Sequence, residues 1–152
     1  MQESVVMEYE EQLTLCSRLA DLALVSPWVD GVVAALGLSS QRRFAIDLCL
    51  EEALSNIVRH GLSGDCNHSV AVRSRIGSVA NGARELFFVL EDDAPHFNPL
   101  DAPIAATGSI PSSIEEIAEG GRGIGLLRRY AGSLHYEALP VGNRLTIGFP
   151  LN

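Results

Sequence analysis

Residues 44–60 constrain the fold most, because they sort into four rows when they are read at a spacing of four. Side chains four residues apart lie on one stripe of an α-helix. Two neighbouring apolar rows predict a long helix with a broad face toward a core. The apolar rows are Ala45-Cys49-Ala53-Ile57 and Ile46-Leu50-Leu54-Val58, and the solvent row is Asp47-Glu51-Ser55-Arg59.

The fourth row of this helix changes character along its length. It begins with Phe44 and Leu48 and continues with Glu52, Asn56 and His60. A buried charge must be paired, bind a ligand or take part in chemistry. The row therefore predicts a helix that faces the core at its start and a polar site at its end.

Composition excludes several classes of function. The net charge of −8 argues against direct binding to nucleic acid or to an anionic membrane. All eleven basic residues are arginine, so no lysine is available to bind a phosphate or form a Schiff base. A bound phosphate would be held by backbone amides, arginine or a metal. We expect one domain over residues 1–152.

The sequence also indicates the cellular compartment. No apolar run reaches the roughly 18 residues of a membrane span, and no signal peptide is visible. The three cysteines, Cys16, Cys49 and Cys66, are odd in number and lack metal-ligand spacing, which predicts free thiols. We therefore expect a cytoplasmic protein with no membrane contact.

The order of predicted elements gives the fold class. Helices followed by strands, a loop, a helix and a closing hairpin indicate an α+β two-layer sandwich, with helices on one face of a mostly antiparallel sheet. Strands are predicted at 11–17, 69–79, 86–90, 134–139 and 144–149. Helices are predicted from a Ser26 cap to Gly37, from a Ser39 or Ser40 cap to Gly61, and from the glycines at 121–125 to Gly132.

Three segments carry groups suited to chemistry. Glu52 and Asn56 lie one turn apart, so a carboxylate that can accept a proton and an amide oxygen that can bind Mg²⁺ reach the same small volume. Asp92 follows an apolar strand and can accept a hydrogen bond from a nucleobase amine. The glycines at 120–125 open a helix, where exposed backbone amides form an anion site. Taken singly, these segments also suit a solvated helix face, a turn and a Gly-rich loop.

Together, in this order, the three segments resemble the nucleotide-binding boxes of the GHKL ATPase superfamily. The chain is most similar to the bacterial anti-sigma-factor serine/threonine-protein kinases, over nearly its whole length. Glu52-Ala53-x-x-Asn56 with His60-Gly61 resembles the N box of that family. The stretches 92–99 and 120–127 resemble its first and second glycine boxes.

The resemblance implies a role for each residue. Glu52 would be the general base, Asn56 would bind Mg²⁺, and Asp92 would accept a hydrogen bond from the adenine amine, with Ala94 at the floor of the adenine site. The segment 98–120 would be a lid over the nucleotide, and Thr146 would line the adenine pocket. The phosphates of ATP or ADP would be held by Gly121, Arg122, Gly123, Ile124 and Gly125.

The family resemblance also implies partners. The protein would phosphorylate a Ser or Thr of a STAS-domain anti-anti-sigma factor, sequester a sigma factor, switch between these partners and form a homodimer. This chain has Ala94 and His96 at positions where the family usually has glycines. A nucleotide-dependent binding module without kinase activity therefore stays open as an alternative, whereas a detached sensor histidine kinase domain is disfavoured because no dimerisation helices with a phospho-acceptor histidine are present.

Overall fold

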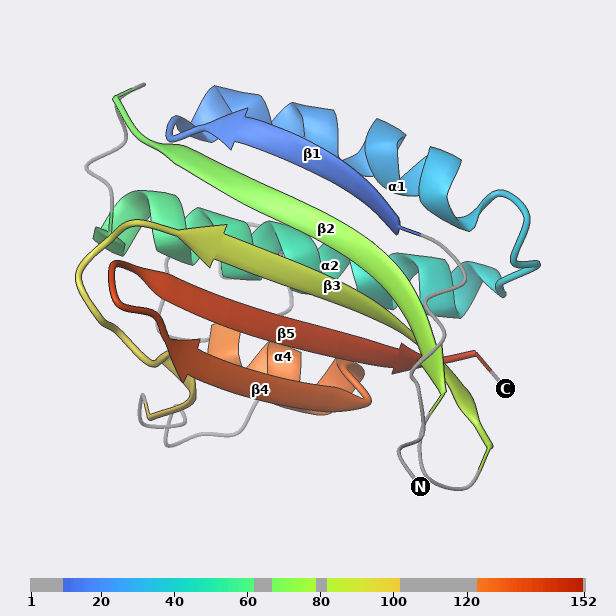
Figure 1. Ribbon diagram of the computed structural model, residues 1–152. Helices are drawn as coiled ribbons and strands as arrows, with labels where there is room; N and C mark the ends of the chain where they lie inside the picture. Colours follow the sequence, from blue (N-terminus) through green and yellow to red (C-terminus); the bar gives the residue numbers. More distant parts are fainter. Residues whose placement is uncertain (1–9, 62–66, 79–81, 102–122, 152) are drawn as a thin grey trace.

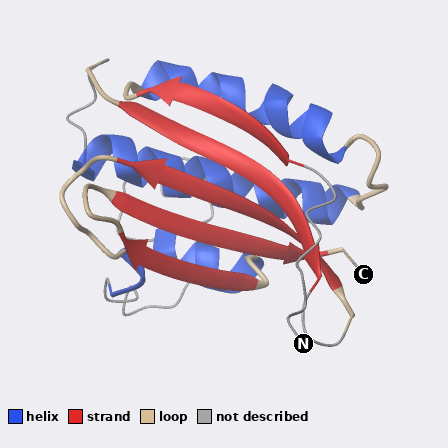
Figure 2. Cartoon of the chain, viewed as in Figure 1, coloured by secondary structure: helices blue, strands red, loops and turns tan. Residues whose placement is uncertain are grey.

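The computed structural model describes residues 10–61, 67–78, 82–101 and 123–151. Five strands and the helices follow one another along the chain (Figure 1), and Figure 2 distinguishes them by type. The elements are β1 (Glu10–Cys16), the 3-10 helix η1 (Leu19–Leu24), α1 (Val25–Val33), α2 (Ser40–Asn56), the π-helical turn η2 (Ile57–Gly61), β2 (Ser69–Ser78), β3 (Arg84–Asp92), the 3-10 helix η3 (Pro99–Asp101), α4 (Gly123–Tyr130), β4 (Ser133–Ala138) and β5 (Asn143–Pro150).

The five strands form one sheet in the order β1-β2-β3-β5-β4, and every neighbouring pair is antiparallel. The helices α1, α2 and α4 all lie behind the sheet as it is drawn in Figure 1. The predicted two-layer α+β sandwich with helices on one face is therefore confirmed. None of the described helices is long and apolar enough to cross a membrane.

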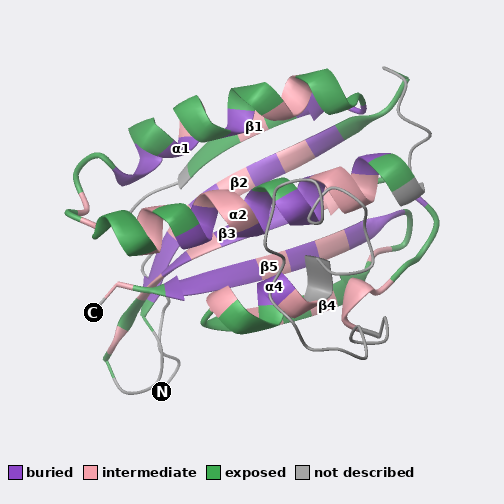
Figure 3. Ribbon diagram, turned by 180° about the vertical axis from the view of Figure 1, so that it is seen from behind, coloured by how far each residue is buried: buried purple, intermediate pink, exposed green. Residues whose placement is uncertain are grey.

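The core lies between α2 and the sheet. Both predicted apolar rows of α2 are buried from Ala45 to Val58, apart from the partly buried Ile57 at the end of one row (Figure 3). Opposite them, the inward side chains of β3 alternate as Leu86, Phe88 and Leu90, all fully buried. Phe88 makes edge-to-face ring contacts with Trp28 and Phe149, at centroid distances of 6.0 and 6.1 Å.

The start of the fourth row differs from its prediction. Phe44 is 60% exposed, so this row does not face the core at the N-terminal end of α2. The two apolar rows take the sheet-facing side of the helix, which turns Phe44 and Leu48 toward η1 and α1. A groove remains open between those helices and α2, and Phe44, Leu48 and Glu52 of the row line it.

Helix ends follow local capping chemistry. The Ser39 hydroxyl accepts a hydrogen bond from the Arg42 amide at 3.1 Å, as a cap of α2 should. Regular α-helix ends at Asn56 and the chain continues as a π-helical turn to Gly61, a feature frequent at functional sites. α1 begins at Val25 rather than after a Ser26 cap, because η1 runs directly into it.

The cysteine prediction is half right. Cys49 is free and fully buried, and burial raises the pKa of its thiol to about 12. Cys16, in contrast, is disulfide-bonded, so a chain of free thiols is the wrong expectation. Cys66 and the side chain of His60 lie outside the described residues. The β1–β2 register pairs Cys16 with Ser69. Two segments far apart in sequence thus lie side by side, and the spacing of the cysteines along the chain does not reveal this.

The outer face of the sheet carries a ladder of charges that crosses four strands. Arg73 of β2 pairs with Glu91 of β3, whose carboxylate also lies 3.4 Å from the Arg144 guanidinium of β5. Arg144 pairs in turn with Glu137 of β4. We call these four residues the ion-pair ladder. Its members are partly exposed, so each pair contributes only about 0–1 kcal/mol to stability.

The β4–β5 hairpin is closed by a glycine that no other residue can replace without movement. Gly142 has φ +98°, and a Cβ built on it would lie 1.8 Å from the backbone oxygen of Asp92. Gly37 also has a positive φ, +63°, but a Cβ there meets no atom within 4 Å. An alanine at position 37 would therefore cause backbone strain alone, whereas an alanine at position 142 would cause both backbone strain and steric overlap.

We predict that Gly142→Ala destabilises the fold much more than Gly37→Ala. Gly37→Ala, the control, should lower the free energy of unfolding by about 1 kcal/mol because of left-handed backbone strain. Gly142→Ala should lower it by about 1–3 kcal/mol more, because the new methyl group overpacks against β3. Urea unfolding followed by circular dichroism measures both free energies. Equal losses in the two variants would contradict the steric argument.

Candidate nucleotide site

A cavity of about 140 Å³ opens where the C-terminal end of α2, the end of β3, the segment after it, α4 and the β4–β5 hairpin meet. A single water needs about 10–15 Å³ of such space, so the cavity accommodates a small organic group. Most of its wall is apolar, with a few polar side chains, as in typical ligand sites. The polar side chains that line it are those of Asn56, Asp92, His96, Tyr136 and Asn143.

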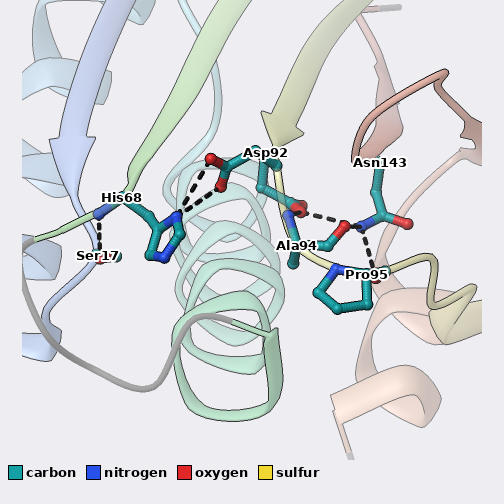
Figure 4. Close-up of polar contacts among 7 residues, drawn as sticks. Ser17, His68, Asp92, Ala94, Pro95 and Asn143 are labelled. Carbon is teal, nitrogen blue, oxygen red and sulfur yellow. Dashed lines mark hydrogen bonds and ion pairs between the residues drawn. The ribbon is translucent and has the colours of Figure 1, made fainter.

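Asp92 reaches this cavity because it continues the inward alternation of β3. Its side chain is 8% exposed, and its Oδ1 accepts hydrogen bonds from the Ala94 amide and from Asn143 Nδ2, both at 2.9 Å (Figure 4). Burial raises the pKa of the Asp92 carboxyl, and these two hydrogen bonds oppose the rise. An acceptor carboxylate is thus held at the wall of an apolar cavity.

The neighbouring carboxylate is used elsewhere. Asp93 is exposed and lies with both carboxylate oxygens 3.2 Å from Nδ1 of His68, while the His68 amide donates to the Ser17 hydroxyl at 3.2 Å (Figure 4). Asp93 does not line the cavity. Of the two adjacent aspartates, only Asp92 is available to a ligand there.

Ala94 and Asn56 lie at the same cavity. Ala94 is 5% exposed and forms part of the wall beside Asp92. Asn56, the last residue of α2, lines the cavity from the helix side. No group of three or more His, Cys, Asp or Glu side chains within the described ranges could hold a metal ion. A Mg²⁺ ion bound through the Asn56 amide oxygen would therefore take further oxygen ligands from water and phosphate, which suits the way magnesium binds.

Glu52 lies one helical turn before Asn56 but on the groove between η1, α1 and α2. Its side chain is only 2% exposed, and its Oε1 has no hydrogen-bond partner among the described residues. Burial is the main cause that raises the pKa of the Glu52 carboxyl; Glu51 adds to the rise and Arg59 opposes it. A buried, unsatisfied carboxyl is rare in folded proteins and indicates a functional group.

The groove beside Glu52 has a mixed lining. Apolar side chains from both walls include Leu19, Leu22 and Phe44, and the last is largely exposed. Asp47, Glu51, Glu52 and Arg59 also line it, so carboxylates outnumber guanidinium groups. Such a surface is able to receive a protein segment that carries apolar and basic side chains.

Two sequence-predicted residues lie away from the cavity: Glu52, which lines the groove instead of sharing a volume with Asn56, and Thr146. Side chains alternate along β5, so Leu145 lines the cavity while Thr146 lies on the outer face of the sheet with Arg73, His135 and Arg144. The expectation that Thr146 lines the same pocket as Asp92 is therefore wrong. A shift of one residue in a strand moves a side chain to the opposite face.

The glycine loop is described only in part. Gly121 and Arg122 lie outside the described residues, and α4 begins at Gly123, with Ile124 and Gly125 in its first turn. Leu127, one turn later, lines the cavity. The start of α4 is thus about 5–6 Å along the helix axis from a cavity residue. Of the predicted lid at 98–120, only 98–101 is described, and Pro99 lies at the cavity.

Sequence reasoning missed two of the polar residues that complete the cavity. Asn143 and Tyr136 line it together with His96, which the sequence had already placed in the first glycine box, whereas Asn143 reads in sequence as a hairpin residue after Gly142. The Gly-Asn pair is typical of turns, and only the β3–β5 register, which pairs Asp92 with Asn143, brings the two side chains together.

Comparison with known proteins identifies the family of this chain. The sequence model of the histidine kinase-like ATPase domain family matches residues 15–149 of this chain. The chain is also 26% identical, over 120 residues, to the serine/threonine-protein kinase BtrW of Bordetella bronchiseptica, and the match covers 79% of each chain. The matched range begins at the end of β1, includes β2, β3, β4 and nearly all of β5, and contains the residues that line the cavity and the groove. The chain therefore belongs to the histidine kinase-like ATPase domain family.

Proposed function

We propose that this protein binds Mg-ATP and transfers the γ-phosphoryl group to a serine or threonine of a protein partner. One observation carries this beyond nucleotide binding: the buried Glu52 carboxyl has an unpartnered Oε1 one helical turn from the cavity residue Asn56. Its neighbour Ser55 is engaged locally, with its hydroxyl 3.2 Å from the Glu52 carbonyl oxygen. The match to a relative named as a serine/threonine-protein kinase supports the same activity.

The nucleotide would occupy the cavity next to Asp92. The carboxylate would accept a hydrogen bond from the adenine amine, and Ala94 and Leu145 would contact the flat base. The phosphates would extend toward the start of α4, where the backbone amides of the glycine loop would act as donors. Bound Mg²⁺, held by Asn56 and phosphate oxygens, would neutralise charge that develops on the β- and γ-phosphates.

The transfer step would depend on Glu52. Its carboxylate accepts the proton of the partner's hydroxyl while the hydroxyl oxygen forms a bond to the γ-phosphorus. The bond between the γ-phosphorus and the bridging oxygen of the β-phosphate breaks, and ADP leaves with that electron pair. A base whose pKa is raised by burial holds the accepted proton more readily than an exposed glutamate does. Positioning and charge neutralisation supply the remaining catalysis, without a lysine.

The partner in this proposal is a STAS-domain anti-anti-sigma factor, and the unphosphorylated partner competes with a sigma factor for the kinase. The groove at Glu52 supports a protein acceptor, since its apolar wall and excess of carboxylates suit a protein surface better than a small polar molecule. A homodimer and a cytoplasmic location belong to the same proposal. The net charge of −8 is consistent with protein partners rather than nucleic acid.

A second candidate is a nucleotide-dependent binding module without catalysis. Ala94 favours it, because its side chain occupies part of the cavity wall where the related kinases usually have glycine. Incubation with Mg-ATP and the cognate STAS-domain protein separates the two functions. Phosphorylation of that protein supports the kinase, whereas nucleotide-dependent capture without phosphorylation supports the module.

We predict that Glu52→Ala lowers phosphoryl transfer by about 100-fold or more, the usual contribution of a general base, while ATP binding is retained. Glu11→Ala is the matched control, since Glu11 is exposed on β1 and lines neither the cavity nor the groove. Transfer of ³²P to the STAS-domain partner measures the first quantity and a fluorescent-nucleotide titration the second. Full transfer by Glu52→Ala would sink the assignment of Glu52 as the base.

We also predict that Glu52→Gln stabilises the fold at neutral pH. A carboxyl whose pKa is raised in the folded protein favours folding at pH values below its unfolded pKa of about 4.3 and loses that contribution as pH rises through the folded value. The variant should thus exceed the wild type in unfolding free energy at pH 7–8, and the difference should vanish near pH 4.

Chemical denaturation of both proteins between pH 4 and pH 8 tests this difference. Glu11→Gln serves as the control, because a substitution at an exposed position away from both sites usually changes the unfolding free energy by less than about 0.5 kcal/mol. A wild type that is more stable than Glu52→Gln at pH 8 would show that Glu52 has a stabilising partner.

A further inference from the structure

Asn143 is the most highly connected polar side chain at the cavity, and the proposed function gives it no role. It is 7% exposed and begins β5 directly after Gly142. Its Nδ2 donates to Asp92 Oδ1 at 2.9 Å, to the Pro95 carbonyl at 3.2 Å and to the Ala94 carbonyl at 3.3 Å (Figure 4). Its Oδ1 accepts from the Phe97 amide at 3.0 Å and from the Tyr136 hydroxyl.

These contacts fix the orientation of the amide. Three acceptor oxygens surround Nδ2, and donors face Oδ1, so a flipped amide would place oxygen against oxygen and nitrogen against an N–H group. The side chain thereby links three elements: the end of β3, the cavity wall at 94–97, and β4 through Tyr136. No other residue type supplies both the donors and the acceptor at this length.

The hydrogen bond from Asn143 helps to fix the orientation of the Asp92 carboxylate. Both of its side-chain hydrogen bonds, from Asn143 and from the Ala94 amide, go to Oδ1. In the part of the chain that the structure describes, no hydrogen bond is assigned to Oδ2. Two donors on one oxygen hold the carboxylate in a single rotamer and leave the second oxygen as the acceptor for a ligand.

We propose that Asn143 is a positioning residue that aims Asp92 Oδ2 at the exocyclic amine of the bound base and so sets selection for a 6-amino purine over a 6-oxo purine. The inference rests on the proposed nucleotide binding and adds a residue that determines base specificity. In this proposal Asn143 acts through Asp92 and through the 94–97 wall, rather than by contact with the phosphates or the acceptor hydroxyl.

The test uses the full chain and two nucleotides that differ only at the base, ATP and inosine triphosphate (ITP). ITP has a carbonyl oxygen where ATP has the amine, so an aimed carboxylate favours ATP. Asn143→Asp keeps the acceptor for Phe97 and Tyr136 but replaces the donor to Asp92 with a second carboxylate. Like charges at hydrogen-bond distance force one of the two to take a proton or turn away.

Isothermal titration with each nucleotide gives the ratio of the two dissociation constants. We expect the preference of the wild type for ATP over ITP to fall by about 10-fold or more in Asn143→Asp, as expected for a hydrogen bond to a charged group. Asn67→Asp, which adds the same charge at an exposed position away from the cavity, should keep the wild-type ratio. Partial unfolding does not change the ratio, because it weakens both nucleotides equally.

Asn143→Ser provides a neutral second variant if the aspartate variant does not fold. An unchanged ATP-to-ITP ratio in a variant that still binds would overturn the inference, and so would an equal loss of both nucleotides in both variants, which indicates a purely structural role. Failure of the wild type to bind either nucleotide would instead refute the proposed function itself, so the two failures are distinguishable.

Discussion

The rotation of α2 about its own axis governs the rest of the site. Burial of its two apolar rows against the sheet fixes that rotation, because any other orientation would expose side chains such as Leu50 and Leu54 that are now fully buried. With the rotation fixed, Asn56 faces the cavity, and Glu52, one turn earlier, faces the groove. A hydrophobic contact therefore places the two groups on which a transfer reaction would depend.

The two buried carboxyls of the site, those of Asp92 and Glu52, differ in their hydrogen bonding. Asp92 receives two hydrogen bonds that partly offset the cost of its burial, and the bonds also orient it. Glu52 is left with an unsatisfied oxygen and a raised pKa. The first arrangement suits a group that recognises a ligand in a fixed orientation, and the second suits a group that exchanges a proton. The difference in hydrogen bonding thus matches the roles proposed for Asp92 and Glu52.

Much of the fold could be predicted from sequence because its signals are local. The apolar rows of α2, the Ser39 cap and the alternation in β2 and β3 each depend on neighbours within a few residues. The site could be predicted where it follows such signals, as Asp92 at the end of β3 does. The role of Asn143, the outward direction of Thr146 and the exposure of Phe44 depend on strand register and helix rotation, which are set by contacts between distant segments.

The ion-pair ladder on the outer face has an effect that its small energy does not suggest. A slip of two residues between β5 and either neighbour keeps every side chain on its present face, so hydrophobic burial alone discriminates weakly against it. In one direction, such a slip would place Glu91 or Glu137 opposite Thr146 instead of Arg144, and the carboxylate would lose its facing cation. The alternating charges thus act on the competing alignments of the strands, and the correct alignment is the one that sets Asp92 beside Asn143.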